Sequence, residues 1–290
     1  MLELSGGPGS WMLGYGGDTL NTAIHLARAG HHVAFLTALG DDPFSLQLRR
    51  QWLAEGLDGT LMLQHPRRHA GLYAISVDAA GERSFTYWRE NSAAREMFSL
   101  PETAAAVAAA STADLLYFSL ITMAILPPEG RARLLALAKD VRSIGGKVAF
   151  DGNYRPRLWD TPAEAMAARD AAIGCADIGL PSLDDEAALS GASGADEVEG
   201  HWTGLGCAEV VVKDAAFGCH LAGGDILAPP AVLAPVDTSG AGDAFNAGYL
   251  GARMKGANVA NAAAAGHALA GWTIMRPGAI PPVAVTGNGL

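Results

Sequence analysis

The most informative segment of this 290-residue chain is Asp237-Thr238-Ser239-Gly240-Ala241-Gly242-Asp243-Ala244-Phe245. It follows an apolar run, residues 231–236, and precedes a helical pattern, residues 244–254. Gly240 and Gly242 allow backbone amides to turn inward and approach an anion closely. The N-terminus of the following helix adds unpaired donors and a partial positive charge. The segment therefore predicts a site for a phosphoryl group.

Asp243 has two interpretations in that setting. A carboxylate at the start of a helix is usually a cap, which contributes about 1 kcal/mol. A carboxylate beside a phosphate site can instead accept the proton of an attacking hydroxyl. The residues alone leave both roles open.

Two other glycine motifs are excluded by spacing. A dinucleotide-binding fingerprint requires a third glycine where Phe245 stands. A Walker-type loop requires Gly-Lys followed by Ser or Thr, whereas Gly146-Lys147 is followed by Val148.

Strand-like and helix-like stretches alternate over most of the chain. Short apolar runs rich in β-branched residues predict strands covered on both faces, at residues 33–38, 115–119, 147–151, 178–180 and 209–213. Residues 129–144 predict a helix with one apolar face, formed by Leu134, Leu137, Val141 and Ile144. Such alternation indicates an α/β fold with a parallel sheet and helices on both sides.

One region departs from that alternation. Residues 71–78 and 83–89 are two strand-like runs joined by residues 79–82, which is typical of a hairpin. Phe85, Tyr87 and Arg89 would share one face of the second strand. We interpret this hairpin, at about residues 70–90, as a small lid on a single domain that spans residues 1–290.

Composition excludes several classes of protein. A formal net charge of −10 and a pI near 5.2 argue against binding to nucleic acid or to an anionic membrane. Residues 258–275 are rich in alanine and predict a buried helix rather than a membrane span. Cys175, Cys207 and Cys219 have no metal-binding or redox spacing, which favours packed, free thiols in a reducing compartment. With no signal peptide visible, we expect a cytoplasmic protein.

Residues 237–245 resemble the C-terminal signature of the ribokinase-like (PfkB) carbohydrate kinases. Gly16-Gly17-Asp18-Thr19-Leu20-Asn21-Thr22-Ala23 is similar to the N-terminal glycine pair and following asparagine of that family. The two motifs occur in the family's order, with a fitting strand–helix pattern between them. The resemblance implies a ribokinase-like three-layer α/β/α sandwich with a mostly parallel, doubly wound sheet and a small β lid.

Further motifs resemble the 2-keto-3-deoxygluconate kinases within that family. They lie at residues 71–73, 87–94, 150–159 and 183–186, so the resemblance covers essentially the whole chain. It implies transfer of the γ-phosphoryl group of ATP, with Mg²⁺, to the 6-hydroxyl of 2-keto-3-deoxygluconate. Asp243 would then be the base, and the transferred group would be stabilised by the amides of Gly240, Ala241 and Gly242.

A sugar acid carries a carboxylate, so its site should contain arginine. Arg89 lies on the lid face with Tyr87, and Arg155 follows the end of a predicted strand, where α/β sheets place ligands. A guanidinium matches a carboxylate with two parallel hydrogen bonds. The alternative for each arginine is a solvated surface charge.

The same resemblance implies the remaining site residues. The substrate would be bound by Gly17, Asp18, Asn21, Tyr73, Tyr87, Arg89 and Arg155. ATP would be bound by Asn153, Ser182, Lys213, Gly218, Gly240, Gly242 and His267, and Mg²⁺ by Glu186 through water. Three alternatives stay open: aromatic packing for Tyr73, a core histidine for His267 and a solvated helix charge for Glu186.

The chain also departs from the family pattern. Family members usually have a strand before the residues that match Met1-Leu2-Glu3-Leu4, and this strand is expected to be missing here. Two other functions therefore stay open: a kinase of a neutral sugar such as fructose or ribose, and a truncated, inactive binding protein. An exposed lid sheet commonly pairs in this family, so the resemblance also implies a homo-oligomer that pairs through the lid.

Overall fold

The computed structural model describes residues 1–7, 9–77 and 83–283. Its central sheet has four parallel strands in the order β10-β9-β8-β7. Four of the predicted runs form these strands: β7 (Leu115–Ser119), β8 (Lys147–Asp151), β9 (Ile178–Gly179) and β10 (Glu209–Val210). The fifth run, residues 33–38, is only partly a strand. There β3 (Thr37–Leu39) pairs in parallel with β4 (Met62–Gln64) in a separate two-stranded sheet.

Side chains of β8 alternate between the two faces of the central sheet, as the period of a strand requires. Val148 and Phe150 belong to one apolar cluster, and Ala149 belongs to another on the opposite face. The first cluster is covered by α3 (Thr103–Ala110), α4 (Leu120–Ile125), α5 (Pro128–Ser143), α6 (Pro162–Ile173), α7 (Leu183–Ser190) and α8 (Ala195–Gly204).

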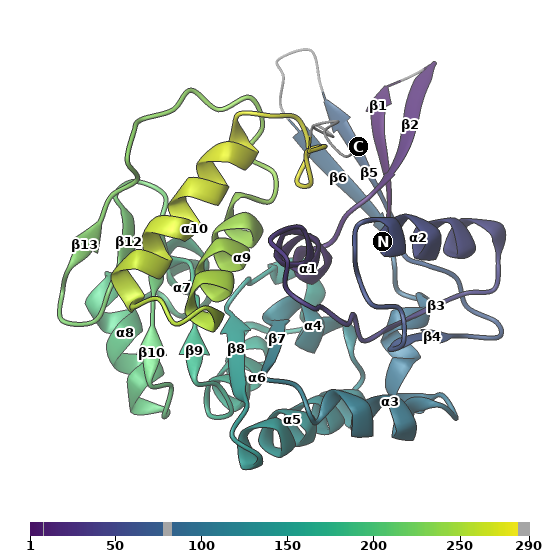
Figure 1. Ribbon diagram of the computed structural model, residues 1–290, viewed down its shortest axis with the longest axis horizontal. Helices are drawn as coiled ribbons and strands as arrows, with labels where there is room; N and C mark the ends of the chain where they lie inside the picture. The colour runs from purple at the N-terminus through teal and green to yellow at the C-terminus, as the bar shows by residue number, and fades with distance from the viewer. Residues whose placement is uncertain (8, 78–82, 284–290) are drawn as a thin grey trace, which may run out of the picture.

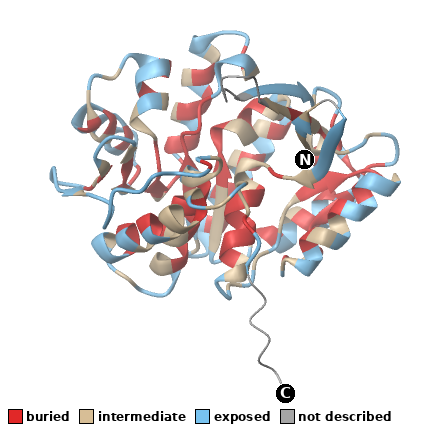
Figure 2. Ribbon diagram, turned by 90° about the horizontal axis from the view of Figure 1, so that it is seen from above, coloured by how far each residue is buried: buried red, intermediate tan, exposed pale blue. Residues whose placement is uncertain are grey.

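The second cluster is covered by three helices that lie in front of the sheet in Figure 1: α1 (Asp18–Arg28), α9 (Ala241–Met254) and α10 (Val259–Ile274). Helices on both faces of a parallel sheet give the predicted three-layer α/β/α sandwich. Figure 2 shows the buried residues between these layers and the exposed residues on the outer sides of the helices.

The helix predicted at residues 129–144 is α5, and its apolar face is formed as expected by Leu134, Leu137 and Val141. The prediction for Ile144 was wrong, because the helix ends at Ser143 and the Ile144 side chain is exposed. The period of a helix places a residue on a face only while the helix continues.

The lid is a four-stranded sheet in the order β2-β1-β5-β6, at the top of Figure 1. The predicted hairpin forms its antiparallel pair β5 (Leu72–Val77) and β6 (Arg83–Trp88), while its turn, residues 79–82, lies outside the described residues. The sequence did not predict the other two strands, β1 (Leu2–Gly7) and β2 (Ser10–Tyr15). The expectation that this chain lacks a strand of the family pattern stays a prediction.

The remaining elements lie beside these layers. A three-stranded antiparallel sheet contains β11 (Val212–Asp214), β12 (Gly218–His220) and β13 (Ile226–Leu227). One further helix, α2 (Pro43–Ala54), packs with α1, and two short 3-10 helices are η1 (Ala93–Ser99) and η2 (Pro156–Leu158).

Two expectations from composition can be compared with the fold. All three cysteines are buried and free, as predicted. The alanine-rich stretch forms α10, which packs in the second cluster. In the part of the chain that the structure describes, no helix has the length and apolar character needed to cross a membrane.

Candidate active site

A cavity of about 1180 Å³ opens at the carboxyl ends of the central strands. This is where open α/β sheets bind ligands. It brings together Asp18 and Arg155 from the predicted substrate site, the loop 240–243, and the five predicted nucleotide residues Asn153, Ser182, Lys213, Gly218 and His267. The other predicted residues, Gly17, Asn21, Tyr73, Tyr87, Arg89 and Glu186, do not line it.

The loop before α9 has the conformation expected of an anion site. Gly240 is the N-cap residue and has a φ of 69°, a left-handed conformation that glycine adopts without strain. The first amides of a helix have no partner within it, so they are available to an anion. The Ala241 amide is an exception here, because it donates to the Thr238 carbonyl at 3.3 Å.

Asp243 lies in the first turn of α9, with a side chain that is 9% exposed. Its carboxylate accepts a hydrogen bond from Nδ2 of Asn21 on α1, at 2.7 Å. Since the N-cap position belongs to Gly240 and α9 has no side-chain cap, the capping interpretation of Asp243 is not supported. The carboxylate bonds across the site instead.

The electrostatic environment of Asp243 suits a base. Burial and then the nearby carboxylate of Asp18 raise its pKa to about 7, against the opposing effects of the Asn21 hydrogen bond and of Lys213. Asp18 is half-buried, and the loss of solvent around its carboxyl raises its own pKa; it accepts a hydrogen bond from the Ser119 hydroxyl. A carboxyl with a pKa near neutrality can accept a proton and release it again.

Lys213 brings a positive charge to this group. Its ammonium forms an ion pair with Asp151 at 2.9 Å and donates to Oδ1 of Asn246 at 3.0 Å. Nδ2 of Asn246 also donates to Asp151, at 2.9 Å, so the three side chains hold one another. A Cβ atom on Gly242 would lie 3.8 Å from the Lys213 ammonium, which places this cation beside the anion loop.

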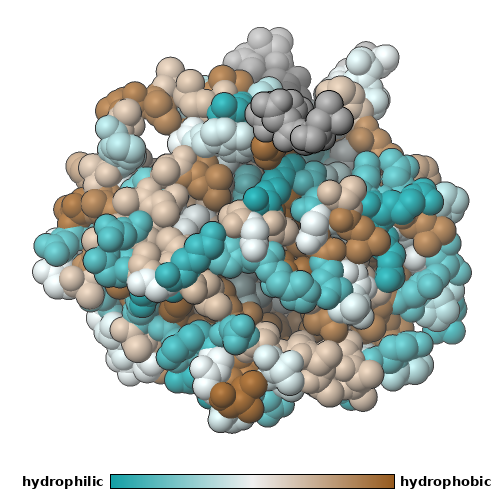
Figure 3. Space-filling model, viewed as in Figure 1, coloured by the Kyte–Doolittle hydropathy of each residue, from teal (hydrophilic) through white to brown (hydrophobic). Residues whose placement is uncertain are grey.

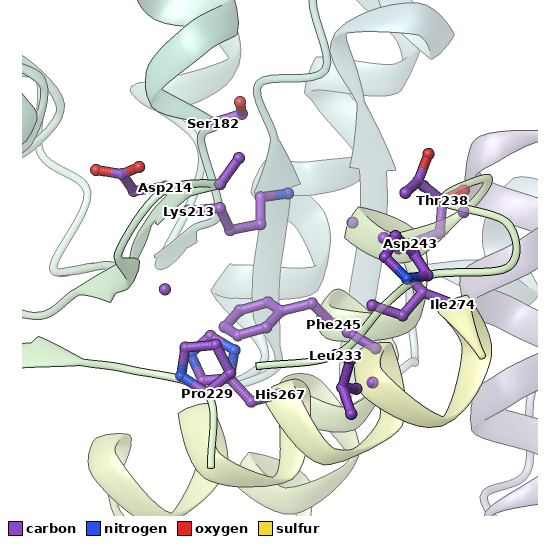
Figure 4. A pocket seen from close by; sticks show the side chains of 18 of the residues that line it. Ser182, Lys213, Asp214, Pro229, Leu233, Thr238, Asp243, Phe245, His267 and Ile274 are labelled. Atoms are coloured by element: carbon purple, nitrogen blue, oxygen red, sulfur yellow. The ribbon is translucent and has the colours of Figure 1, made fainter. Parts of the chain in front are cut away.

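The far end of the cavity is mostly apolar. Figure 4 shows His267, Phe245 and Pro229 grouped there, while Lys213 extends into the cavity from the β11 side. The His267 ring contacts Phe245 edge-on at 5.1 Å, and its Nε2 donates to the Leu227 carbonyl at 2.9 Å. Burial lowers the pKa of His267, which keeps the ring neutral. The His267 ring therefore packs against Phe245 and also lines the cavity.

The loop 228–236 covers this apolar end. Val232 and Val236 are exposed on it, and the upper-left edge of the surface in Figure 3, where the loop lies in Figure 1, is correspondingly hydrophobic.

Within the described residues, Asn153 has a buried Oδ1 atom without a hydrogen-bond partner. Because it lines the cavity, it is available to a ligand donor.

The lid contributes a second group of side chains. The Tyr73 hydroxyl donates to Glu3, which stands opposite Tyr73 in the β1–β5 register. The Tyr73 and Tyr87 rings lie 6.0 Å apart, and the Arg89 guanidinium stacks 4.3 Å from the centre of the Tyr87 ring. The shared face predicted for Phe85, Tyr87 and Arg89 is consistent with these contacts, and with the Phe85 and Tyr87 rings stacked at 6.3 Å. Burial lowers the Arg89 pKa, and the nearby Tyr87 and Asp18 side chains oppose this shift.

Glu3 was missed by the sequence analysis. It lies among apolar and small residues, and its function depends on a partner seventy positions away. The structural reason for glycine at position 16 was also missed. A Cβ atom on Gly16 would meet the Tyr73 hydroxyl oxygen at 2.3 Å, so glycine there leaves room for the lid tyrosine.

Arg155 is placed differently from Arg89. Its Nη1 atom donates to the Tyr154 carbonyl at 2.5 Å and to Asp185 at 3.1 Å, and its side chain is half-exposed. Part of its charge is therefore already compensated. We expect Arg155 to contribute less than Arg89 to binding an anionic substrate.

The placement of Glu186 contradicts its predicted role at a magnesium ion. Its carboxylate is buried outside the cavity, where Arg169 donates to it at 2.6 Å and Trp202 Nε1 at 3.1 Å. It is not a solvated helix charge either. Its neighbours Asp184 and Asp185, two and one positions earlier on α7, face the cavity instead.

Replacing Glu186 by Gln is expected to lower the free energy of unfolding by about 3 kcal/mol, because it leaves the Arg169 cation buried with one fewer partner. Burial raises the pKa of Glu186, so the pair is costly to form as well as to break. Urea unfolding measures the loss, with Glu197→Gln on the exposed side of α8 as control. A changed Mg²⁺ requirement at unchanged stability would contradict this assignment.

Comparison with known proteins agrees with this geometry. A parallel α/β sheet with a cavity at the carboxyl ends of its strands is typical of proteins that bind small ligands there, and the sequence model for the pfkB family of carbohydrate kinases matches residues 3–285. The chain therefore belongs to the pfkB family of carbohydrate kinases.

Individual relatives are informative too. A 2-dehydro-3-deoxygluconokinase from Escherichia coli K12 is 41% identical over 97% of this chain and 94% of its own length. A PfkB protein from Polaromonas sp. JS666 has a TM-score of 0.84 at 26% identity, covering 95% and 93% of the two chains. An aminoimidazole riboside kinase from Salmonella enterica, solved with its riboside and an ATP analog, has a TM-score of 0.81 at 27% identity, covering 96% and 92%.

Proposed function

We propose that this chain is an ATP- and Mg²⁺-dependent kinase that phosphorylates the 6-hydroxyl of 2-keto-3-deoxygluconate, the sugar acid in the name of its 41% identical relative. The observation that carries the proposal is the position of Arg89. It is a half-buried cation stacked on the Tyr87 ring of the lid, and the Asp18 carboxylate acts on its pKa. A neutral sugar gives no reason to place a guanidinium there, whereas a carboxylate does. We propose one kinase domain over residues 1–290, with about residues 70–90 in its lid.

The nucleotide fits the cavity from its apolar end. An adenine ring would pack among Phe245, His267 and Pro229, and the phosphates would extend toward Lys213 and the anion loop. The Asp184, Asp185 and Asp214 carboxylates that line the cavity are the oxygen donors that Mg²⁺ prefers. Among the residues that the structure describes, no three metal-binding side chains converge. This fits an ion that binds together with nucleotide phosphates, where it would neutralise their charge.

The chain's own residues would act in a direct, in-line transfer. Closing the lid excludes water that would otherwise hydrolyse ATP. Arg89, with a smaller contribution from Arg155, holds the substrate carboxylate so that the far hydroxyl faces the cavity. Asp243 accepts the proton of that hydroxyl. The hydroxyl oxygen forms a bond to the γ-phosphorus while the bond between this phosphorus and the ADP oxygen breaks. The amides of Gly240 and Gly242 stabilise the charge on the group in transfer, whereas the Ala241 amide donates to the Thr238 carbonyl.

The test is ADP release from purified protein with Mg-ATP, comparing 2-keto-3-deoxygluconate, fructose and ribose. Turnover with the sugar acid alone is the expected result. Turnover with a neutral sugar would support the neighbouring function and contradict the role given to Arg89. Binding of ATP and sugar acid without turnover, seen as thermal shifts, would support the inactive binding protein.

We also propose that the lid mediates a homo-oligomer. The strands β2 and β6 expose large apolar side chains, namely Trp11, Met12, Leu13, Phe85 and Trp88. A sheet with so much uncovered apolar surface favours a partner, and a second copy of this chain offers the same surface. We expect light scattering to give the mass of a dimer, and Trp11→Glu to give a monomer. A monomeric wild-type protein would contradict the proposal.

A further inference from the structure

Helix α1 holds the proposed base through two contacts. Asn21 donates to the Asp243 carboxylate at 2.7 Å, and the Thr22 hydroxyl donates to the Asp243 carbonyl at 3.1 Å. Both residues are buried. Two of the proposed substrate residues, Asp18 and Asn21, also lie on α1. The same helix therefore fixes the position of Asp243 relative to the substrate.

The next turn of the same helix binds the chain segment after α10, residues 276–281. Nε2 of His25 lies 3.1 Å from the Ala279 carbonyl oxygen, and Nη1 of Arg28 donates to the Pro281 carbonyl at 2.8 Å. Because residues 21, 25 and 28 are spaced four and three apart, they share one face of the helix.

Both contacts are well defined. A carbonyl only accepts, so His25 must carry its proton on Nε2 and donate it. The side chain is 3% exposed, and burial lowers its pKa, which keeps the ring neutral. Arg28 is oriented by Glu55, whose two oxygens accept from its other nitrogens at 2.7 and 2.8 Å.

The segment 276–281 forms the back wall of the anion loop. Oδ2 of Asp237 accepts from the Gly278 amide at 2.8 Å, and its Oδ1 accepts from the Ser239 amide at 2.8 Å. A Cβ atom on Gly240 would lie only 2.6 Å from the Cβ atom of Ala279. The backbone at Gly240 therefore rests directly on Ala279, whose carbonyl is the one that His25 holds.

We propose that His25 is a positioning residue for phosphoryl transfer, which fixes the Gly240–Gly242 loop by anchoring Ala279 behind it. One face of α1 then sets both reacting parts of the site: the base through Asn21 and Thr22, and the anion loop through His25 and Arg28. Donors to a transferring group must be held within a fraction of an ångström, and a misplacement of about 1 Å can cost about 100-fold in rate. The inference rests on the proposed kinase function.

The test compares His25→Leu, which removes the donor, with His25→Gln, whose Nε2 can still reach the carbonyl. The exposed His32→Leu is the control. We expect His25→Leu to lower kcat by about 10- to 100-fold with KM for both substrates changed by less than about threefold. His25→Gln should recover most of the loss. Because a partial loss of folded protein would also lower the apparent kcat at unchanged KM, each rate is divided by the folded fraction measured by thermal unfolding.

A second readout does not require the sugar. The affinity for AMP-PNP relative to ADP reports contacts to the γ-phosphate, so this ratio should fall in His25→Leu and be retained in His25→Gln. An unchanged ratio together with unchanged kcat would overturn the proposal. If the wild type turns over none of the sugars, the proposed function fails, while the nucleotide ratio still tests His25. If His25→Leu does not fold, His25→Asn, which is too short to reach Ala279, replaces it in the same comparison.

Discussion

Replacing Asp243 by Asn is expected to lower kcat with the sugar acid by about 1000-fold, while KM for ATP changes by less than about threefold. The substitution keeps the shape of the side chain and an oxygen that can accept from Asn21. It removes the group that takes the proton of the attacking hydroxyl. Since binding contacts are retained, the loss should fall on kcat. Initial rates of ADP release measure it, and thermal unfolding checks that the variant is folded.

The pH dependence of the wild type gives an independent check on the same group. Burial and the Asp18 charge raise the pKa of Asp243 to about 7 in the free protein. A base must be deprotonated, so kcat/KM should be level above that pH and fall about tenfold for each pH unit below it. The residual activity of Asp243→Asn should lack this dependence.

A true helix cap provides the matched control. Asp42 is the N-cap residue of α2, where its carboxylate accepts from the Phe44 and Ser45 amides. Asp42→Ala should cost about 1 kcal/mol of stability without a change in kcat. If Asp243→Asn behaved in the same way, with lower stability and unaltered kcat, Asp243 would not be the base.

The cap and the base could not be distinguished from the sequence, because the distinction depends on a partner 222 residues away. The local pattern Gly240-Ala241-Gly242-Asp243 correctly predicted a helix N-terminus here, because glycine conformations and helix starts are local properties, but α9 begins at Ala241 rather than at the predicted Ala244. Only the packing of α1 against α9 brings Asn21 to the Asp243 carboxylate.

The error at Glu186 has a similar origin. Asp184, Asp185 and Glu186 are consecutive acids on one helix, and their sequence does not tell which of them faces the nucleotide cavity. That is decided by Arg169 on α6 and Trp202 on α8, which surround the Glu186 carboxylate. The parallel strands and the hairpin were predictable because runs of apolar residues and alternating faces carry their own signal. The pairing of buried charges leaves no such signal in the local sequence.

Arg89 should determine the preference for an acid substrate. Arg89→Met is expected to lower kcat/KM for 2-keto-3-deoxygluconate by about 100-fold, as expected for losing about 3 kcal/mol of charge-assisted hydrogen bonding. The methionine retains much of the packing against the Tyr87 ring, so the lid sheet is preserved. Steady-state kinetics with the acid and with a neutral sugar measure the effect, and any slow turnover of the neutral sugar should change by less than about threefold.

Two related variants sharpen the argument. Arg89→Lys keeps the charge but loses the planar pair of donors, so its loss should be intermediate. Arg155→Met should cost less than Arg89→Met, since Asp185 already compensates part of the Arg155 charge at 3.1 Å. Equal losses for acid and neutral substrates in Arg89→Met would mean that Arg89 supports the lid through Tyr87. A larger loss in Arg155→Met would place the substrate carboxylate at the end of β8. Only a loss that is selective for the acid and largest at position 89 fits a carboxylate held by the lid.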